Sequence, residues 1–325
     1  MPDNPPMHLL IPFAASHSDG AVAALSQLQL PHLQKLLTLL SAQAPQLHDV
    51  MSFSPPHECA LAQALGLSVV DGHIPWAALQ ARQAPSLPPV LAEADQAWGF
   101  VSLCHWQVNT NHMVMSHLPL PGLTAQQSDD LLAAMRPYFE EDGIALYPDQ
   151  PGRYLAQAPI LANIDTASLD RVVGHNLEHW MPSATQAGAL LRLQNEMQML
   201  FYTHPVNDQR AAQGLPPVNS FWLSGTGALP AGYQEPNADA TPVVVEELRA
   251  AALAENWAAW SQAWEQLDAT LIKSLLELAL SDKPMQITLC GERASQSWQL
   301  QKRSLWQKLS GHFAAKPLSE LLKSL

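Results

Sequence analysis

The sequence predicts an α/β fold, in which apolar strand-like runs alternate with amphipathic helices. A short apolar run at 8–15 (HLLIPFAA) has the length and character of a buried strand. An amphipathic helical run follows at 30–40 (LPHLQKLLTLL), where Pro31 suits the first turn of a helix. The 325 residues are enough for one large α/β unit or for two domains.

Composition narrows the class of protein. The hydrophobic fraction of 47% supports a sizeable core, and the net charge of −13 argues against general affinity for nucleic acid or an anionic membrane. Three widely spaced cysteines (Cys59, Cys104 and Cys290) fit reduced thiols better than a disulfide framework. The apolar run at 9–15 is too short for a signal core, and no run reaches the ~18 residues of a membrane span. We therefore expect an acidic, cytoplasmic protein with no nucleic-acid or membrane partner.

The middle of the chain alternates strands and helices. We expect a strand at 100–103, a helix at 126–139 with Ser128 or Thr124 as its cap, and two strands at 144–147 and 153–156. A short helix at 166–173 and a longer one at 190–202 follow. These elements belong to the α+β lobe.

The C-terminal part combines strands with a long helical run. A short strand is expected at 220–223, and the segment 243–248 leads into a continuous helix at 250–280. Trp257, Trp260 and Trp264 form an apolar stripe on that helix, which is either core or, if exposed, a face for a partner. Strands at 285–290 and 297–301 make a hairpin, and a short helix ends the chain at 317–325.

The most informative stretch is 200–229 (LFYTHPVNDQRAAQGLPPVNSFWLSGTGAL). Its polar groups, including His204, Asn207, Arg210 and Asn219, exceed what a plain surface turn needs. The closely spaced Gly225 and Gly227 after a strand let the backbone approach a ligand or a neighbouring element. On these local features alone a tight strand-to-loop turn is favoured over a ligand loop.

This stretch resembles the segment HPxNxxRxxxGxxPANxxxxxGxG of archaeal-type cofactor-independent phosphoglycerate mutases, which belong to the alkaline-phosphatase superfamily. The chain also resembles a bacterial set described as RpfE-type regulatory or phosphoglycerate-mutase-like proteins. The resemblance implies an alkaline-phosphatase-like central sheet flanked by helices. It places the α/β core domain at 1–98 and 215–325, and the inserted α+β lobe at 99–214. Members of the mutase family are metal-dependent phosphoryl-transfer enzymes.

A second region, 52–81, resembles the family's PGSDxAxLxLLGxxP and GRGPxEA motifs, with departures at the chemistry. The resemblance places His57 where the family has its nucleophilic Ser, Glu58 at the following Asp, and His73 where the family has Arg. Imidazole can accept a phosphoryl group or bind a metal, but it does not replace a Ser alkoxide. Pro56, followed by His57 and Glu58, predicts the start of a helix, where Glu58 suits the positive helix end. His57 and His73 either face an anion at this helix N-terminus or belong to an ordinary capping turn.

The family's metal ligands have few counterparts here. The first strand of the superfamily usually ends in a metal-binding Asp, whereas this one runs into Pro12, and Asp19 better suits a turn or a helix cap. The only histidine between 232 and 325 is His312. A two-metal phosphoryl-transfer site needs about six to eight carboxylate and imidazole ligands. We therefore expect no cofactor, since the ligands that a divalent metal would need are missing.

The resulting hypothesis is a degenerate phosphoglycerate-mutase-like protein that has lost the two-metal phosphoryl-transfer centre and acts as a ligand-binding or regulatory protein. The expected partner is a small phosphorylated metabolite. The expected ligand-binding residues are His57, Glu58, His73, His204, Asn207, Arg210, Asn219, Gly225 and Gly227. The alternative is a divergent phosphoglycerate mutase or phosphatase with His57 as catalytic phosphoryl acceptor, assisted by His73 and Arg210. A lesser alternative is a structural interaction module that acts through an exposed tryptophan stripe.

Overall fold

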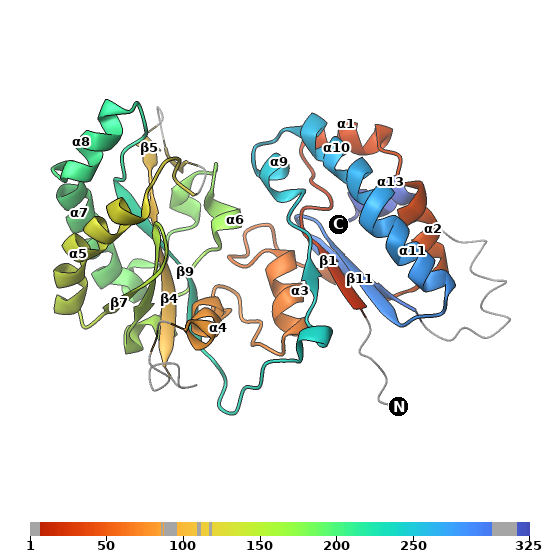
Figure 1. Ribbon diagram of the computed structural model, residues 1–325, viewed down its shortest axis with the longest axis horizontal. Coiled ribbons are helices and arrows are strands. Elements are labelled where there is room, and N and C mark those ends of the chain that lie inside the picture. The colour runs from red at the N-terminus through yellow and green to blue at the C-terminus, as the bar shows by residue number, and fades with distance from the viewer. Residues whose placement is uncertain (1–6, 86, 88–95, 109–111, 117–118, 301–316) are drawn as a thin grey trace. The chain divides into compact units, whose positions relative to one another are not determined.

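The computed structural model describes residues 7–85, 87, 96–108, 112–116, 119–300 and 317–325, and it divides the chain into two compact units (Figure 1). Unit 1 comprises Met1–Val50, Pro55–Gly66 and Glu235–Leu325, and unit 2 comprises Met51–Ser54 and Leu67–Gln234. These limits differ from the expected boundaries at 98 and 215. The reason is that the strands near both boundaries pair with each other, so both belong to the sheet of unit 2. His312 lies outside the described residues.

Unit 1 is built on a mixed sheet with the strand order β10-β1-β11-β12-β2, and β3 pairs with β12 beside β2. The parallel part consists of β1 between β10 and β11, and β12 runs antiparallel to β11 as the second arm of a hairpin. The strands are β1 (Met7–Ile11), β2 (Ser41–Ala42), β3 (Gln46–Leu47), β10 (Val243–Val244), β11 (Met285–Cys290) and β12 (Ala294–Gln299). The expected central sheet is confirmed, although β12 begins before residue 297, and residue 301 lies outside the described part.

The two faces of this sheet differ. Leu9, Ile11, Ile287 and Leu289 alternate onto one face and are fully or almost fully buried in the main core of the unit. The helices that bury this face carry the leucine and tryptophan side chains of the same core; they are α1 (Asp19–Gln27), α2 (Pro31–Leu39), α10 (Trp257–Leu267), α11 (Lys273–Leu280) and α13 (Leu318–Lys323). The opposite face packs against α3 (Pro56–Ala64), as Figure 1 shows.

The prediction of one continuous helix at 250–280 is wrong, because the structure has a break in this run. The chain forms α9 (Arg249–Leu253), breaks, and continues as α10, a π-helical turn η5 (Asp268–Ile272) and α11. The break falls at Glu255, whose φ of +50° lies in the left-handed region that ends a helix. Trp260 and Trp264 are fully buried, so the tryptophan stripe is core. The ring of Trp257 lies directly over Gly20, where a β-carbon would clash with it.

Unit 2 contains an antiparallel sheet with the strand order β7-β8-β4-β9. Its strands are β4 (Ala97–Cys104), β7 (Ala145–Gln150), β8 (Arg153–Gln157) and β9 (Ser220–Ala228), and a two-stranded sheet joins β5 (Trp106–Val108) to β6 (Met113–Met115). The helical elements are α4 (Trp76–Gln83), α5 (Ala125–Glu141), η2 (Pro159–Asn163), α6 (Leu169–Val172), η3 (Leu177–His179), α7 (Ala184–Tyr202) and α8 (Pro205–Ala212). Thr124 and Gln127 form a capping box at the start of α5, which confirms Thr124 as the cap.

In unit 2 the helices α5 and α7 cover one face of the sheet, where Phe139 and Phe221 meet at a ring distance of 5.3 Å. The helix α4 packs on β4 and β9 next to Phe100 and Gly225. Along the described parts of the chain, no helix is both long enough and apolar enough to cross a membrane.

Candidate functional site

The expected site residues are divided between the two units. His57 and Glu58 lie in unit 1, and the other seven lie in unit 2. The two histidines that the sequence suggested as a pair, His57 and His73, therefore belong to different units. Each unit offers its own candidate site.

In unit 1 the candidate lies where β1 and β11 end and α3 begins. In sheets with parallel strands, ligands bind beyond the carboxyl ends of the strands, and this is the corresponding edge. Here β1 continues into Pro12 and Phe13, and the N–H of Ala14 donates to the carbonyl of Cys290 at 2.8 Å, which ties the ends of the two strands together. The backbone at this edge is therefore held by a hydrogen bond between the segments that follow the two strands.

Phe13 is the most unusual residue at this edge. Its φ of +54° is in the left-handed region, which costs about 1–3 kcal/mol for a side chain other than glycine. Trp260 Nε1 donates to the carbonyl of Phe13 at 2.9 Å and holds the turn in this conformation. The Phe13 ring packs against the His57 imidazole with 5.0 Å between centroids, so backbone strain and a candidate site residue coincide.

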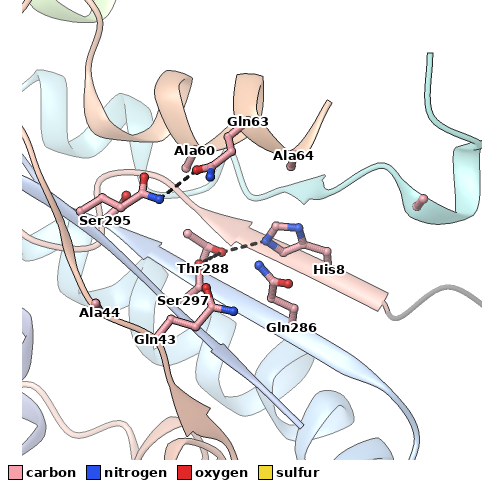
Figure 2. A pocket seen from close by; sticks show the side chains of 12 residues that line it. His8, Gln43, Ala44, Ala60, Gln63, Ala64, Gln286, Thr288, Ser295 and Ser297 are labelled. Carbon is pink, nitrogen blue, oxygen red and sulfur yellow. Dashed lines mark hydrogen bonds between the residues drawn. The ribbon is translucent and has the colours of Figure 1, made fainter. Parts of the chain in front are cut away.

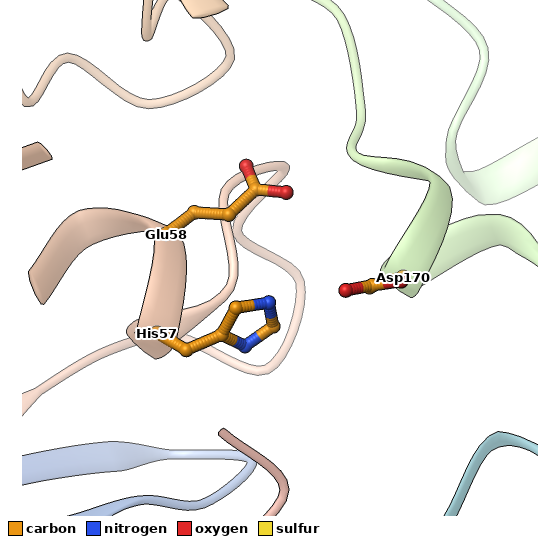
Figure 3. Close-up of side chains that lie close together, drawn as sticks. All are labelled: His57, Glu58 and Asp170. Carbon is orange, nitrogen blue, oxygen red and sulfur yellow. The ribbon is translucent and has the colours of Figure 1, made fainter. Parts of the chain in front are cut away.

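His57 and Glu58 occupy the first turn of α3, as the sequence predicted (Figure 3). Pro55 is the N-cap and Pro56 follows it, which fixes the start of the helix. Both side chains are half-buried, and Glu58 carries its negative charge at the positive end of the helix. The turn therefore presents an imidazole and a carboxylate side by side.

Other acid and imidazole groups of unit 1 are engaged elsewhere. Glu292, just after β11, accepts from the backbone N–H of His17 at 3.1 Å and lies 3.3 Å from His17 Nδ1. Asp19 is the first residue of α1, and the cap of this helix is Ser18 and not Asp19, because the Ser18 hydroxyl accepts from the N–H of Ala21. Within the described residues of unit 1 taken alone, no three His, Cys, Asp or Glu ligand atoms come within 4.8 Å of one another.

In unit 2 the polar residues of the 200–229 stretch hold the backbone of their own segment. His204 caps α8 by accepting from the N–H of Val206 at 3.3 Å. Asn207 donates to the carbonyls of Phe201 at 2.8 Å and Val218 at 2.7 Å, and its Oδ1 accepts from the Val218 N–H at 2.8 Å. The amide of Asn207 thus joins the end of α7 to the segment that leads into β9.

Arg210 and Asn219 have similar roles. Arg210 is completely buried; its Nε donates to the carbonyl of Pro216 at 2.8 Å and Nη2 to that of Pro121 at 3.1 Å. Burial lowers the pKa of the guanidinium. Asn219 pairs with both backbone groups of Trp106, which attaches β5 to the start of β9. The four polar residues that suggested a ligand-binding loop therefore stabilise the backbone of their own segment and of its neighbours.

The expected turn at 224–227 is wrong, because β9 continues through it to Ala228. Its register against β4 shifts between Trp98 and Phe100, so Gly225 and Gly227 lie opposite an irregularity. Gly225 has a φ of +62°, and a β-carbon there would lie 3.0–3.1 Å from Phe100 and Trp76. The glycines let the N-terminus of α4 approach the strand, which is the second of the two roles considered from the sequence.

His73 stands in a pinned loop next to this strand. Its Nε2 lies 2.5 Å from Asp165 Oδ1, with both side chains partly exposed. The preceding residue Gly72 is held on both sides, because its N–H donates to Ser54 Oγ and its carbonyl accepts from the N–H of Thr166, each at 3.0 Å. The carboxylate of Asp165 therefore orients the imidazole of His73, and the hydrogen bonds of Gly72 hold the loop that carries it.

Sequence reasoning missed Asp165, the partner of His73. The residue stands in an irregular segment far along the chain from His73, so no spacing or motif connects the two. Only the hydrogen bonds of Gly72 and Thr166 bring their loops together.

No family model matches the sequence. A relative, the probable 2,3-bisphosphoglycerate-independent phosphoglycerate mutase of Geobacter sulfurreducens, is 25% identical over 165 residues, which is 50% of this chain and 41% of that protein. The chain is thus similar to the cofactor-independent phosphoglycerate mutases. The part of this chain that matches covers well under two thirds of that relative's length.

Two solved structures are similar to this chain. The PH0037 protein from Pyrococcus horikoshii gives a TM-score of 0.44 at 12% identity, covering 91% of this chain and 87% of its own. The cofactor-independent phosphoglycerate mutase from Thermoplasma acidophilum gives 0.40 at 14% identity, with coverages of 99% and 95%. The mixed α/β fold with a central sheet flanked by helices is confirmed by the strand order of unit 1 itself.

Proposed function

We propose that this chain is a phosphoglycerate-mutase-like protein that has lost the two-metal phosphoryl-transfer centre and acts as a ligand-binding or regulatory protein. The regulatory role of the RpfE-type set, the phosphorylated ligand and the cytoplasmic location belong to the same proposal.

The observation that carries the proposal is the edge of the unit 1 sheet beyond β1 and β11. A two-metal centre requires clustered carboxylate and imidazole ligands on rigid strand ends. The two strands instead lead to Phe13, Cys290 and the His57 ring that packs on Phe13. Glu292, the carboxylate nearest along the chain to the end of β11, already pairs with His17.

The ligand-binding part of the proposal rests on His57, Glu58 and His73. His57 and Glu58 are partly accessible on the first turn of α3, and His73 is oriented by Asp165. His204, Asn207, Arg210 and Asn219 are better supported as positioning residues, since their side chains hydrogen-bond to main-chain groups. Gly225 and Gly227 have no side chain to block the start of α4, so this helix can pack closely on β9.

The second candidate is a phosphoryl-transfer enzyme with His57 as the acceptor. The strained turn at Phe13 against His57 favours it, since such strain gathers at active sites. Against it, the guanidinium of Arg210 is fully buried and bonded to two carbonyls, so it is not available to stabilise a phosphoryl group. The tryptophan-face hypothesis loses its basis, because Trp260 and Trp264 are buried.

The decisive experiment measures conversion of 3-phosphoglycerate to 2-phosphoglycerate by the full chain, with Mn²⁺, Mg²⁺ or Zn²⁺ and after treatment with a chelator. We expect no turnover in any state, together with saturable calorimetric binding of a phosphorylated compound that His57→Ala weakens about tenfold or more. His112→Ala, at an exposed histidine of unit 2, is the matched control and should bind normally.

Metal-dependent turnover would overturn the proposal and show that a metal centre is present. Turnover that survives chelation and disappears in His57→Ala would establish the histidine-acceptor enzyme instead. Absence of both turnover and binding of phosphorylated compounds would remove the ligand-binding part.

A further inference from the structure

The face of the unit 1 sheet that packs against α3 carries a polar pocket, distinct from the strand-end site. The pocket has a volume of about 380 Å³ and is lined by twelve residues (Figure 2). They are His8, Gln43, Ala44, Gln46, Ala60, Gln63, Ala64, Ala240, Gln286, Thr288, Ser295 and Ser297. His8 lies near the start of β1, whereas the candidate site of the preceding sections lies beyond its end.

The pairing of the strands explains why polar side chains gather here. His8 is the cross-strand neighbour of Gln286, and Thr288 is the neighbour of Ser297. Because side chains alternate along a strand, these four residues share one face, while Leu9, Ile287 and Leu289 point into the core. A sheet face beneath a helix is normally apolar, so a polar one needs a separate reason.

A chain of hydrogen bonds crosses the floor of the pocket. His8 Nε2 lies 2.8 Å from Thr288 Oγ1, which lies 2.7 Å from Ser297 Oγ (Figure 2). Thr288 is only 2% exposed, and its hydroxyl is fixed by the two contacts. Fixed hydroxyls of this kind orient a ligand by direct hydrogen bonds.

The walls add side-chain amides and small apolar groups. Gln46 Nε2 donates to Gln63 Oε1 at 2.9 Å, which joins the β3 segment to α3 across the pocket. Ala60 and Ala64 are the α3 residues beside Gln63, and their short side chains leave the volume open. Amides provide donors and acceptors, and alanine methyl groups provide surface for C–H groups.

The charge of the lining restricts the class of ligand. Its one titratable group is His8, and burial lowers the pKa of His8 to about 4, so the imidazole is neutral near pH 7. A bound phosphate or carboxylate would lose hydration without gaining a cationic partner. Sugar and polyol hydroxyls each donate and accept, which matches hydroxyl and amide groups without any charge. A volume of about 380 Å³ falls in the ~300–1,000 Å³ range of small-ligand sites.

We propose that this pocket binds an uncharged polyhydroxylated ligand, of the size of a sugar or cyclitol, through the hydrogen-bonded row of His8, Thr288 and Ser297 and the amides of Gln46 and Gln63. The proposal is independent of whether the strand-end site binds a phosphorylated compound.

The test is calorimetric titration of the full chain with glucose, myo-inositol and sucrose as neutral probes, and with glucose 6-phosphate as the charged counterpart. We expect saturable binding of at least one neutral probe, and weaker or no binding of the phosphate ester. Gln63→Leu, at an exposed position of α3, should weaken the neutral probe about tenfold or more. Thr288→Val should do the same, because it removes the central hydroxyl while keeping the shape of the side chain.

Gln34→Leu is the matched control, since Gln34 is an exposed glutamine of the same unit on α2, away from the pocket. Its affinity should equal that of the unchanged protein. The proposal is overturned if no neutral probe binds saturably, if Gln63→Leu binds as well as Gln34→Leu does, or if glucose 6-phosphate binds more tightly than glucose and Gln63→Leu weakens that binding. Gln63→Leu keeps the test decisive should Thr288→Val fail to fold.

Discussion

The carboxylate of Asp268 caps the first turn of α2, because its Oδ2 accepts from both the backbone N–H of His32 at 3.2 Å and ring Nδ1 at 2.8 Å. Its Oδ1 accepts from the N–H of Leu33 at 2.7 Å. The N-cap residue of α2 is Leu30, which has no capping side chain, so a residue from the π-helical turn η5 does this instead. The π-helical turn η5 is thus hydrogen-bonded to the start of α2.

Asp268→Ala is predicted to destabilise the protein by about 2–4 kcal/mol, since it leaves two N–H groups at the start of α2 without an acceptor. Urea unfolding followed by tryptophan fluorescence measures the change, because Trp260 and Trp264 lie in the same core. The control is Glu265→Ala, an exposed carboxylate on α10, which should change stability by less than about 0.5 kcal/mol. Equal effects in the two variants would contradict the capping role.

Arg210→Met is predicted to destabilise the protein by about 2–4 kcal/mol, with or without any ligand. The substitution keeps most of the volume but removes the donors for the carbonyls of Pro216 and Pro121. Thermal and urea unfolding provide the measurement, and Arg192→Met, at an exposed helix position, is the control with a small effect. An Arg210→Met protein of unchanged stability that no longer binds a phosphorylated compound would restore Arg210 as a ligand residue.

Gly225→Ala is predicted to cost about 1–3 kcal/mol, because the φ of +62° and the contacts with Phe100 and Trp76 both oppose a β-carbon. The same substitution at Gly188, a helical residue of α7 with no atom within 4 Å of the added carbon, should stabilise by about 0.5–1 kcal/mol. Unfolding midpoints of the two variants give the comparison. If Gly225→Ala matched the unchanged protein, the close approach of α4 would not require glycine.

Stability is predicted to fall as pH decreases from 6.5 toward about 4, in part through His8. Burial lowers the folded-state pKa of His8 from 6.5 to about 4, so in this window the unfolded chain binds a proton that the folded chain does not. Above 6.5 the imidazole is neutral in both states and contributes no pH dependence. His8→Gln removes the titration and should lessen the decline in urea midpoint between about pH 7 and about pH 4.5. An identical decline of the urea midpoint in both proteins would show that protonation of His8 does not contribute to the pH dependence of stability.

Much of the local structure was determined by the sequence itself. The apolar runs and helix caps placed β1, α2, α5 and β11 close to their observed bounds, because hydrophobic periodicity and capping are properties of neighbouring residues. The start of α3 at Pro56, with His57 and Glu58 in its first turn, was also predicted. Helical spacing predicted the apolar stripe of Trp257, Trp260 and Trp264, and the burial of Trp260 and Trp264 places that stripe in the core.

Tertiary structure alone decided which elements share a sheet and what the polar residues do. The pairing of β4 with β9 moved both unit boundaries, and the bulge between these strands turned an expected loop at Gly225 into a strand. Asn207, Arg210 and Asn219 bond to backbone groups brought close by folding, which no spacing along the chain reveals. The His8–Thr288–Ser297 row likewise exists only because β1, β11 and β12 pair in one register. The sequence gives the type of each side chain and its local periodicity. The hydrogen-bond partner of a polar side chain depends on which distant segments the fold brings next to it.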